Sequence, residues 1–128
     1  MIVDTSVFIA FYHESDVHHR EAVEKFQDID SLAKNDTIII SDYQLNEIVS
    51  VALRKMGLAK SKIILELLLN HESMLIRHTS SQEFYSIIDV FKSQDKNLNF
   101  VDCSIVWLAN NAAQKVVSFD GNLIGYLG

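Results

Sequence analysis

Short apolar runs alternate with longer stretches of helical periodicity along the chain. Residues 1–3, 37–40, 73–77 and 115–119 are rich in apolar and β-branched side chains, which predicts four short buried strands. The stretches between them place apolar residues three and four positions apart, as amphipathic helices do. Strands that alternate with helices are typical of βα units. We therefore expect an α/β fold, a three-layer α/β/α sandwich with a central parallel sheet of four to five strands.

Polar residues mark the expected ends of these helices. Ser41 with Gln44, and Ser80 with Glu83, have the spacing of a capping box, in which each side chain bonds the backbone N–H of the other residue. Gly57 is expected to end the helix that follows Ser41. The other expected helices are a short one at 7–11, longer ones at 16–27 and 60–70, and one that begins at Asp102.

The chain of 128 residues has the length of one domain, and no linker is visible in it. Proline is absent and three of the four glycines are among the last eight residues, so we expect a single domain over 1–128. No apolar run approaches the roughly 20 residues of a membrane-spanning helix, and the N-terminus does not resemble a signal peptide. The single cysteine, Cys103, excludes an internal disulfide. These features predict a cytoplasmic protein.

The charge balance of the chain is acidic. Lysine and arginine number 11 and aspartate and glutamate 17, which gives a formal net charge of −6. This is the opposite of the basic surface that is typical of nucleic-acid-binding domains. A nucleic-acid ligand would therefore need bound cations near its phosphates.

Four acidic residues occupy positions where ligands bind in parallel sheets, beyond the carboxyl ends of the strands. Asp4 directly follows the first expected strand, Glu47 lies in the second turn of the helix after the second strand, Asp102 begins a helix, and Asp120 directly follows the fourth strand. Each also has an ordinary structural explanation, as a helix cap, an Asp-Gly turn or a solvated helix residue. Periodicity alone does not distinguish Glu47 from other helical acids.

Four blocks of the chain, taken in order, resemble the motifs of a known family. They read IVDTSVFIAF with a following DVHHREA, then SDYQLNEIVSVALRK, then DKNLNFVDCSIVWLANN, and finally VVSFDGNL. In this order they look like the PIN-domain ribonucleases, the superfamily that contains the VapC-like toxins of toxin–antitoxin pairs, over essentially the whole chain. The resemblance implies that Asp4, Glu47, Asp102 and Asp120 form an acidic quartet.

Two positions bear on this resemblance. Asn122 stands two residues after Asp120, where many relatives carry a second acid or another polar residue, so the outer part of the expected metal site is weaker here. Asp95 lies where relatives often have an acid, and we interpret it as a possible support residue.

Converging carboxylates favour a bound cation. Two of them about 4 Å apart repel by roughly 4 kcal/mol at an effective dielectric of 20, so they take up protons or bind cations. Hard oxygen ligands select Mg²⁺ or Mn²⁺, which act on water and phosphate in phosphodiester hydrolysis. We expect Asp4 and Asp102 to be the direct ligands and Glu47 to orient or deprotonate the attacking water. Asp120 is expected to complete the site or to hold a second ion.

Other polar side chains are secondary candidates. The hydroxyls of Thr5 and Ser6 suit either a substrate phosphate and the acidic network or simple helix capping. His18 and His19 are adjacent on an expected helix and point about 100° apart, so we interpret them as structural. Basic residues that suit either the RNA backbone or a solvated helix face are Arg54, Lys55, Lys60, Lys62 and Lys92.

The leucine-rich segment 60–70 is apolar on more than one side of its expected helix. A helix of this kind is either deeply buried or covers a partner. We expect it, with the helix before it, to form a homodimer interface or a groove for an antitoxin segment.

The sequence thus predicts a Mg²⁺- or Mn²⁺-dependent endoribonuclease, the toxin of a toxin–antitoxin pair. One alternative is a catalytically silent PIN-like module that binds proteins. Another is a haloacid-dehalogenase-like phosphatase, because IVDTS places an acid after an apolar strand. That fold needs a second acid two positions later, where this chain has Ser6. The sequence does not name the RNA target or the number of metal ions.

Overall fold

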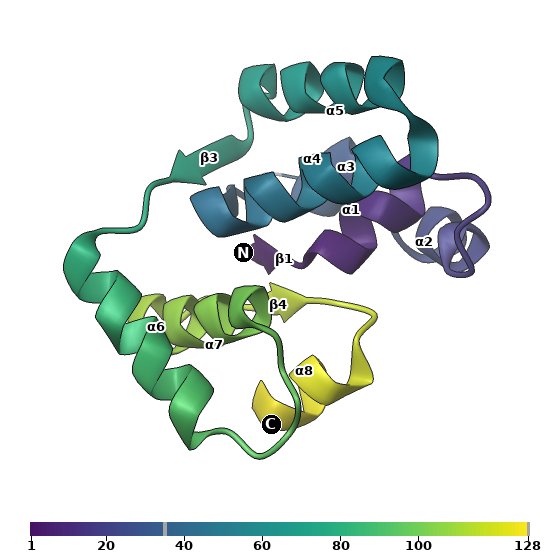
Figure 1. Cartoon of the computed structure of the whole chain (residues 1–128). Coiled ribbons are helices and arrows are strands. Elements are labelled where there is room, and N and C mark those ends of the chain that lie inside the picture. Colours follow the sequence, from purple (N-terminus) through teal and green to yellow (C-terminus); the bar gives the residue numbers. More distant parts are fainter. Residues whose placement is uncertain (35, 128) are drawn as a thin grey trace.

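The computed structural model describes residues 1–34 and 36–127 (Figure 1). Its centre is a parallel sheet with the strand order β3-β2-β1-β4. The expected α/β sandwich around a parallel sheet is confirmed. The strands of the described residues are β1 (Ile2–Val3), β2 (Ile38–Ser41), β3 (Met74–Arg77) and β4 (Val116–Val117).

Helices cover both faces of this sheet. Five of them precede β3 or lead into it: α1 (Thr5–Tyr12), α2 (His19–Phe26), α3 (Ile29–Ala33), α4 (Asp42–Met56) and α5 (Leu58–Asn70). The other three follow β3: α6 (Ser81–Ser93), α7 (Phe100–Ala112) and α8 (Gly121–Leu127). No helix among them is long and apolar enough to span a membrane, within the residues that the structure describes.

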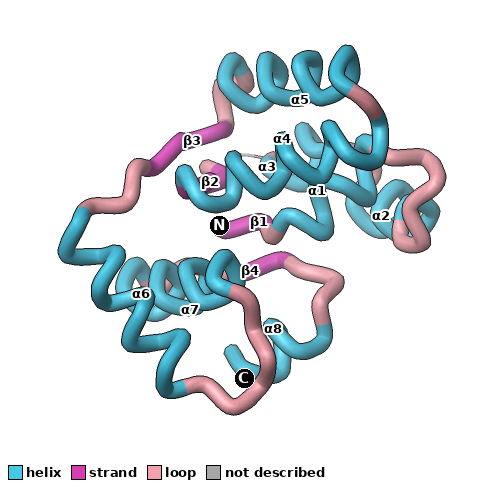
Figure 2. The backbone as a smooth tube through the Cα atoms, in the orientation of Figure 1, coloured by secondary structure: helices cyan, strands magenta, loops and turns pink. Residues whose placement is uncertain are grey.

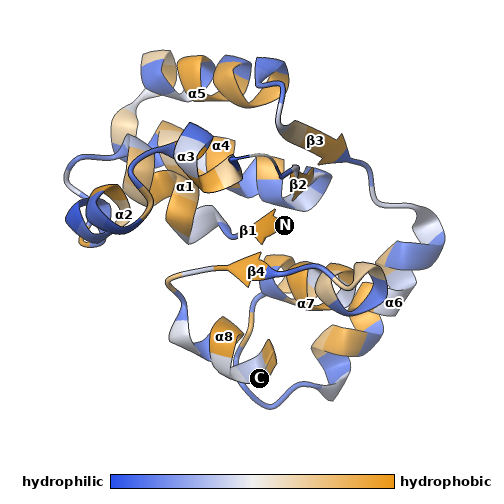
Figure 3. Ribbon diagram, turned by 180° about the vertical axis from the view of Figure 1, so that it is seen from behind, coloured by the Kyte–Doolittle hydropathy of each residue, from blue (hydrophilic) through white to orange (hydrophobic). Residues whose placement is uncertain are grey.

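The alternation of side chains along a strand divides the core in two. In β1, Val3 belongs to a core cluster with residues of α1, α3, α4 and α5, whereas its neighbour Ile2 belongs to a second cluster with residues of α6, α7 and α8. In β2, Ile38 and Ile40 belong to the first cluster and Ile39 contacts the second. The strands β1 and β4 are accordingly coloured as apolar in Figure 3. The sheet is therefore buried on both faces, as parallel sheets are.

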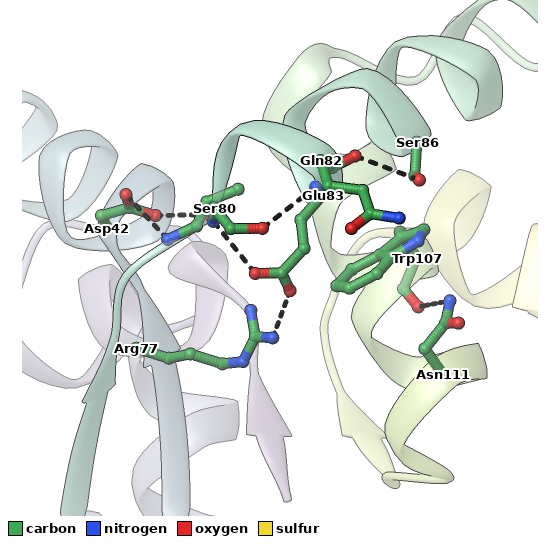
Figure 4. Close-up of polar contacts among 9 residues, drawn as sticks. Asp42, Arg77, Ser80, Gln82, Glu83, Ser86, Trp107 and Asn111 are labelled. Carbon is green, nitrogen blue, oxygen red and sulfur yellow. Dashed lines mark hydrogen bonds and ion pairs between the residues drawn. The ribbon is translucent and has the colours of Figure 1, made fainter.

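Both expected capping boxes are present. Ser41 and Gln44 bond each other's backbone N–H at the start of α4, and Ser80 and Glu83 do the same at the start of α6. Arg77, at the end of β3, also donates to Glu83, as Figure 4 shows. Gly57 ends α4 with φ +89°, a conformation that favours glycine. Local sequence therefore sets the boundaries of these two helices.

Several expected boundaries were wrong. Asp102 does not begin α7: Asn99 is its N-cap and Asp102 occupies the third helical position, where the two residues form another capping box. Strand β4 has only two residues, and α2 begins at His19 because the residues before it form turns. The sequence pattern did not predict the short helices α3 and α8, which have too few residues for a periodic signal.

Candidate active site

The predicted acidic quartet lines one cavity of about 280 Å³. Asp4 directly follows β1, α4 contributes Glu47, α7 contributes Asp102, and Asp120 follows β4. Because β1 and β4 are parallel neighbours, their carboxyl ends meet at one edge of the sheet. Side chains that are far apart in the sequence are thus gathered at a single point.

Asp4 is held by hydroxyl groups. It stands at the N-cap position of α1 but makes no side-chain capping bond. Instead its Oδ2 accepts hydrogen bonds from Ser6 Oγ at 2.9 Å and from Ser118 Oγ at 2.7 Å. Only 4% of the residue is exposed, and this burial raises its pKa against the opposing effect of the two serines. Helix capping therefore does not explain Asp4.

Asp102 is the acid of this cavity whose pKa is most clearly raised. Its Oδ2 accepts the backbone N–H of Asn99 at 3.1 Å, which fixes the side chain at the first turn of α7. Burial raises its pKa to about 6, and the charges of Asp4, Asp120 and Glu47 act in the same direction. The other three carboxylates are therefore close enough to disfavour the ionisation of Asp102.

Asp120 and Glu47 complete the quartet. Asp120 Oδ1 accepts the backbone N–H groups of Asn122 at 2.9 Å and Leu123 at 3.3 Å, so it caps α8. Glu47 is half-buried; burial raises its pKa, and the charge of Asp4 adds to this shift. The Thr5 hydroxyl lies near enough to oppose the shift, although it does not reach hydrogen-bond geometry.

The side chains of the cavity could hold a cation that keeps part of its bound water. The hydrogen bonds that Asp102 and Asp120 accept from the described residues involve one oxygen of each carboxylate, which leaves the other oxygen for a ligand. The buried Thr5 hydroxyl has no hydrogen-bond partner. Within residues 1–34 and 36–127, no three His, Cys, Asp or Glu side chains form a ready-made set of metal ligands. Magnesium fits such a site, because it usually binds one or two carboxylates and keeps several waters.

Basic side chains also reach this cavity. Arg54 and Lys55 lie two turns beyond Glu47 on α4 and line the same space. These two basic side chains therefore lie beside the four acids while remaining exposed to solvent. The other basic candidates, Lys60, Lys62 and Lys92, do not line this cavity.

Sequence reasoning missed three polar residues that line the cavity, namely Asp16, His18 and Asn99. The ring of His18 stacks on Phe119, with centroids 4.8 Å apart, directly before Asp120. Its neighbour His19 bonds the Ala10 carbonyl at 2.6 Å, as expected of a structural histidine. Only the capping position of Asn99 carried a sequence signal, since Asn99 and Asp102 have capping-box spacing.

Of the remaining secondary candidates, some line the acidic cavity and others lie outside it. Thr5 and Ser6 line the cavity, whereas Asp95 lies outside it in the exposed segment between α6 and α7. Asn122 is exposed in the first turn of α8. Cys103 is fully buried among apolar side chains, as a packed thiol is.

Comparisons with known proteins agree on the type of fold. A family model described as "PIN domain" matches residues 1–126. Among solved structures, VapC20 of Mycobacterium tuberculosis, described as a sarcin-ricin loop cleaving toxin, is similar with a TM-score of 0.83. The two sequences are 19% identical, and the match covers 98% of this chain and 93% of that one. The search of curated proteins finds no match.

Proposed function

Because the chain belongs to the PIN domain family, we propose that it is a metal-dependent endoribonuclease that hydrolyses RNA phosphodiester bonds. The observation that carries this proposal is the convergence of Asp4, Glu47, Asp102 and Asp120 on one cavity. The similarity of the fold to VapC20, a sarcin-ricin loop cleaving toxin, supports a toxin of the same class.

We assign Mg²⁺ or Mn²⁺ to the cavity, with Asp4 and Asp102 as its direct ligands and Asp120 beside them. When bound, the ion neutralises phosphate charge and activates phosphorus towards attack by water. Glu47, whose raised pKa makes it a better proton acceptor than an ordinary carboxylate, orients the attacking water and takes up its proton. Arg54 and Lys55 attract the phosphates on either side of the cleaved bond.

We also propose the partners that such a toxin requires. These are an RNA substrate, a cognate antitoxin protein and a second copy of the chain in a homodimer. Helix α5 supports the protein partners because several of its large apolar side chains are exposed. The cytoplasm, where RNA and an antitoxin would meet the protein, is the expected location.

The proposal is tested by RNA cleavage with purified protein. We expect cleavage of single-stranded or structured RNA in Mg²⁺ or Mn²⁺ and none in a chelator. The variants Asp4→Asn and Asp102→Asn should each lower kcat/KM by at least about a hundredfold, because each loses a charged metal ligand. Asp89→Asn, which changes an exposed acid of α6 outside the cavity, is the matched control and should keep full activity.

Two results would contradict the assignment. Folded Asp4→Asn and Asp102→Asn variants with wild-type activity would show that the reaction occurs elsewhere. A folded wild-type protein that binds a protein partner but cleaves no RNA with either metal ion would instead favour the catalytically silent module.

A further inference from the structure

A second cavity, of about 640 Å³, adjoins the acidic one. It is formed by the end of α6, the start of α7 and the loop between them, which is pink in Figure 2. Asn99 lines both cavities, so the two spaces share a wall. A ligand that extends from the acidic cavity past Asn99 would enter this second space.

Aromatic rings form one side of the second cavity. Phe91 and Phe100 both line it, with ring centroids 6.3 Å apart and an interplanar angle of 44°. Phe100 is held in place by the edge of Tyr43 at 5.5 Å and by Phe84 at 5.9 Å. Phe91 is 46% exposed. The site therefore offers one fixed ring and one ring open to solvent.

The loop that closes the cavity is ordered by its own hydrogen bonds. Gln94 Nε2 donates to the Leu98 carbonyl at 2.6 Å, and the Leu98 N–H donates to Gln94 Oε1 at 2.7 Å. Asn97 takes a left-handed conformation with φ +60°, which asparagine tolerates better than most residues. A loop held in this way pays little further ordering cost when a ligand binds.

Polar groups around the rings remain available. Asn99 uses Oδ1 to accept the Asp102 N–H, and its Nδ2 makes no hydrogen bond within the described residues. The side chains of Asp95 and Asn97, which also line the cavity, likewise make none there. Donors and acceptors beside an aromatic face are the combination that recognises an unstacked nucleobase. Lys92 and Lys96 do not line the cavity but are exposed next to lining residues in the sequence.

Resting on the proposed ribonuclease function, we propose that the second cavity binds one unpaired nucleobase of the RNA. The base stacks against Phe91, with its edge towards Asn97 and Asn99, while a phosphate one or a few nucleotides away lies among the four acids. A base inside a duplex is stacked on both faces and paired along its edge, so it is not accessible to this cavity.

The first test compares variants at two exposed aromatic residues of α6. Phe91→Ala should lower kcat/KM on a single-stranded RNA pool of random sequence by about five- to a hundredfold, the range that loss of one stacked base produces. Phe91→Trp should restore most of the activity, because it retains a ring. Tyr85→Ala is the matched control: Tyr85 is 66% exposed on the same helix but does not line the cavity, and this change should have no effect. Thermal unfolding verifies that every variant is folded.

The second test removes the base instead of the ring. End sequencing of the products identifies a cleaved bond, and the RNA around it is then made with one abasic nucleotide at successive positions. At one fixed distance from the bond, the abasic change should lower wild-type kcat/KM by the same factor as Phe91→Ala. It should cause no additional loss in Phe91→Ala, because the two changes remove the same contact.

The outcomes separate this inference from the function on which it depends. If the wild-type protein cleaves no RNA, both are overturned. If it cleaves RNA but Phe91→Ala behaves like Tyr85→Ala, or the abasic loss is equal in wild type and Phe91→Ala, only the base-binding cavity is overturned. A change in oligomeric mass with Phe91→Ala would assign the surface to a contact between copies of the chain and would also overturn it.

Discussion

The carboxyl group of Asp102 is buried, and the negative charges of three neighbouring acids disfavour its ionisation. Its pKa of about 6 in the folded protein lies above the ordinary value of 3.8. A raised pKa means that the folded state favours the protonated form, so ionisation of Asp102 destabilises the fold. This destabilisation is absent at pH values below the pKa of the unfolded chain. It grows as the pH rises towards 6 and is constant above that value.

We therefore expect the metal-free protein to lose stability between about pH 4 and pH 6. Asp102→Asn should abolish most of this loss and stabilise the metal-free protein at about pH 7 by roughly 1–2 kcal/mol, after allowance for solvent screening. Magnesium should stabilise the wild-type protein at about pH 7 and much less at about pH 5, where Asp102 is protonated. Denaturant unfolding with chelator or with Mg²⁺ measures both effects.

Asp42 provides a control, because its pKa is shifted in the opposite direction to that of Asp102. Burial acts to raise its pKa, but hydrogen bonds from the Thr79 hydroxyl at 2.6 Å and backbone N–H at 3.1 Å outweigh burial, and the pKa is lowered. Figure 4 shows this carboxylate beside the start of α6. Asp42→Asn should destabilise the protein above about pH 4 and leave its response to Mg²⁺ unchanged. If Asp42→Asn and Asp102→Asn changed the stability of the protein in the same direction, the proposed electrostatic origin of the pH dependence would be contradicted.

Helix α4 positions Glu47 through its buried N-terminus. Gln44 is fully buried, and its Nε2 donates to the Val3 carbonyl of β1 at 2.8 Å, one residue before Asp4. Its Oε1 also accepts the Ser41 N–H at 3.4 Å. The capping box thus joins the first turn of α4 to the end of the strand that presents Asp4.

Gln44→Ala should destabilise the protein by about 2–3 kcal/mol, because it leaves buried backbone groups without partners. It should also lower ribonuclease kcat/KM, since Asp4 and Glu47 lose their common support. Urea denaturation and cleavage assays measure the two losses. Gln82→Ala, at an exposed position of α6, should change neither. A stable Gln44→Ala variant with full activity would show that this contact does not position the site.

Secondary structure with a strong local signal was predictable from the sequence, and structure without one was not. The Ser41 and Ser80 capping boxes and Gly57 gave correct boundaries because their chemistry is local. The start of α7 was placed wrongly because Asp102 resembles an N-cap, although Asn99 performs that role. The proximity of Asp102 to Asp4 depends on tertiary packing, which no local pattern encodes.

The prediction that the four acids form one group came from the resemblance of four sequence blocks to a known family, and not from any local pattern. His18 was interpreted as purely structural because an adjacent pair of histidines lacks ligand spacing. In the structure it lies on the wall of the acidic cavity, where the ring of Phe119 holds it. The stacking partner lies about a hundred residues away along the chain, which explains why sequence spacing did not reveal it.

Helix α5 lies at the outside of the molecule, beyond α4 (Figure 1). Its residues Ile64 and Leu68 are buried, but Ile63 and Leu67 are 58% and 49% exposed and line an open groove. An apolar groove of this kind on a small protein indicates a partner. The helix therefore packs against the core with one side and leaves apolar side chains of the other side exposed.

We expect the protein to form a homodimer through this outer side of α5. The double change Ile63→Lys with Leu67→Lys should convert a dimer to a monomer in size-exclusion chromatography with light scattering, because it places charges in an apolar contact. Leu75→Lys changes a leucine that is 52% exposed on β3 and serves as the control. A wild-type protein that is monomeric at high concentration would contradict the dimer and leave the groove to an antitoxin.

The order of strands in the sheet bears on how the protein is made. Strand β1 is the first of the described strands to be synthesised, yet it pairs with β4, the last, and Asp4 meets Asp120 only through this pairing. A nascent polypeptide cannot complete the acidic cavity until residue 120 has left the ribosome. For the proposed ribonuclease, translation that stops before residue 120 therefore yields fragments that lack one of the four acids of the cavity.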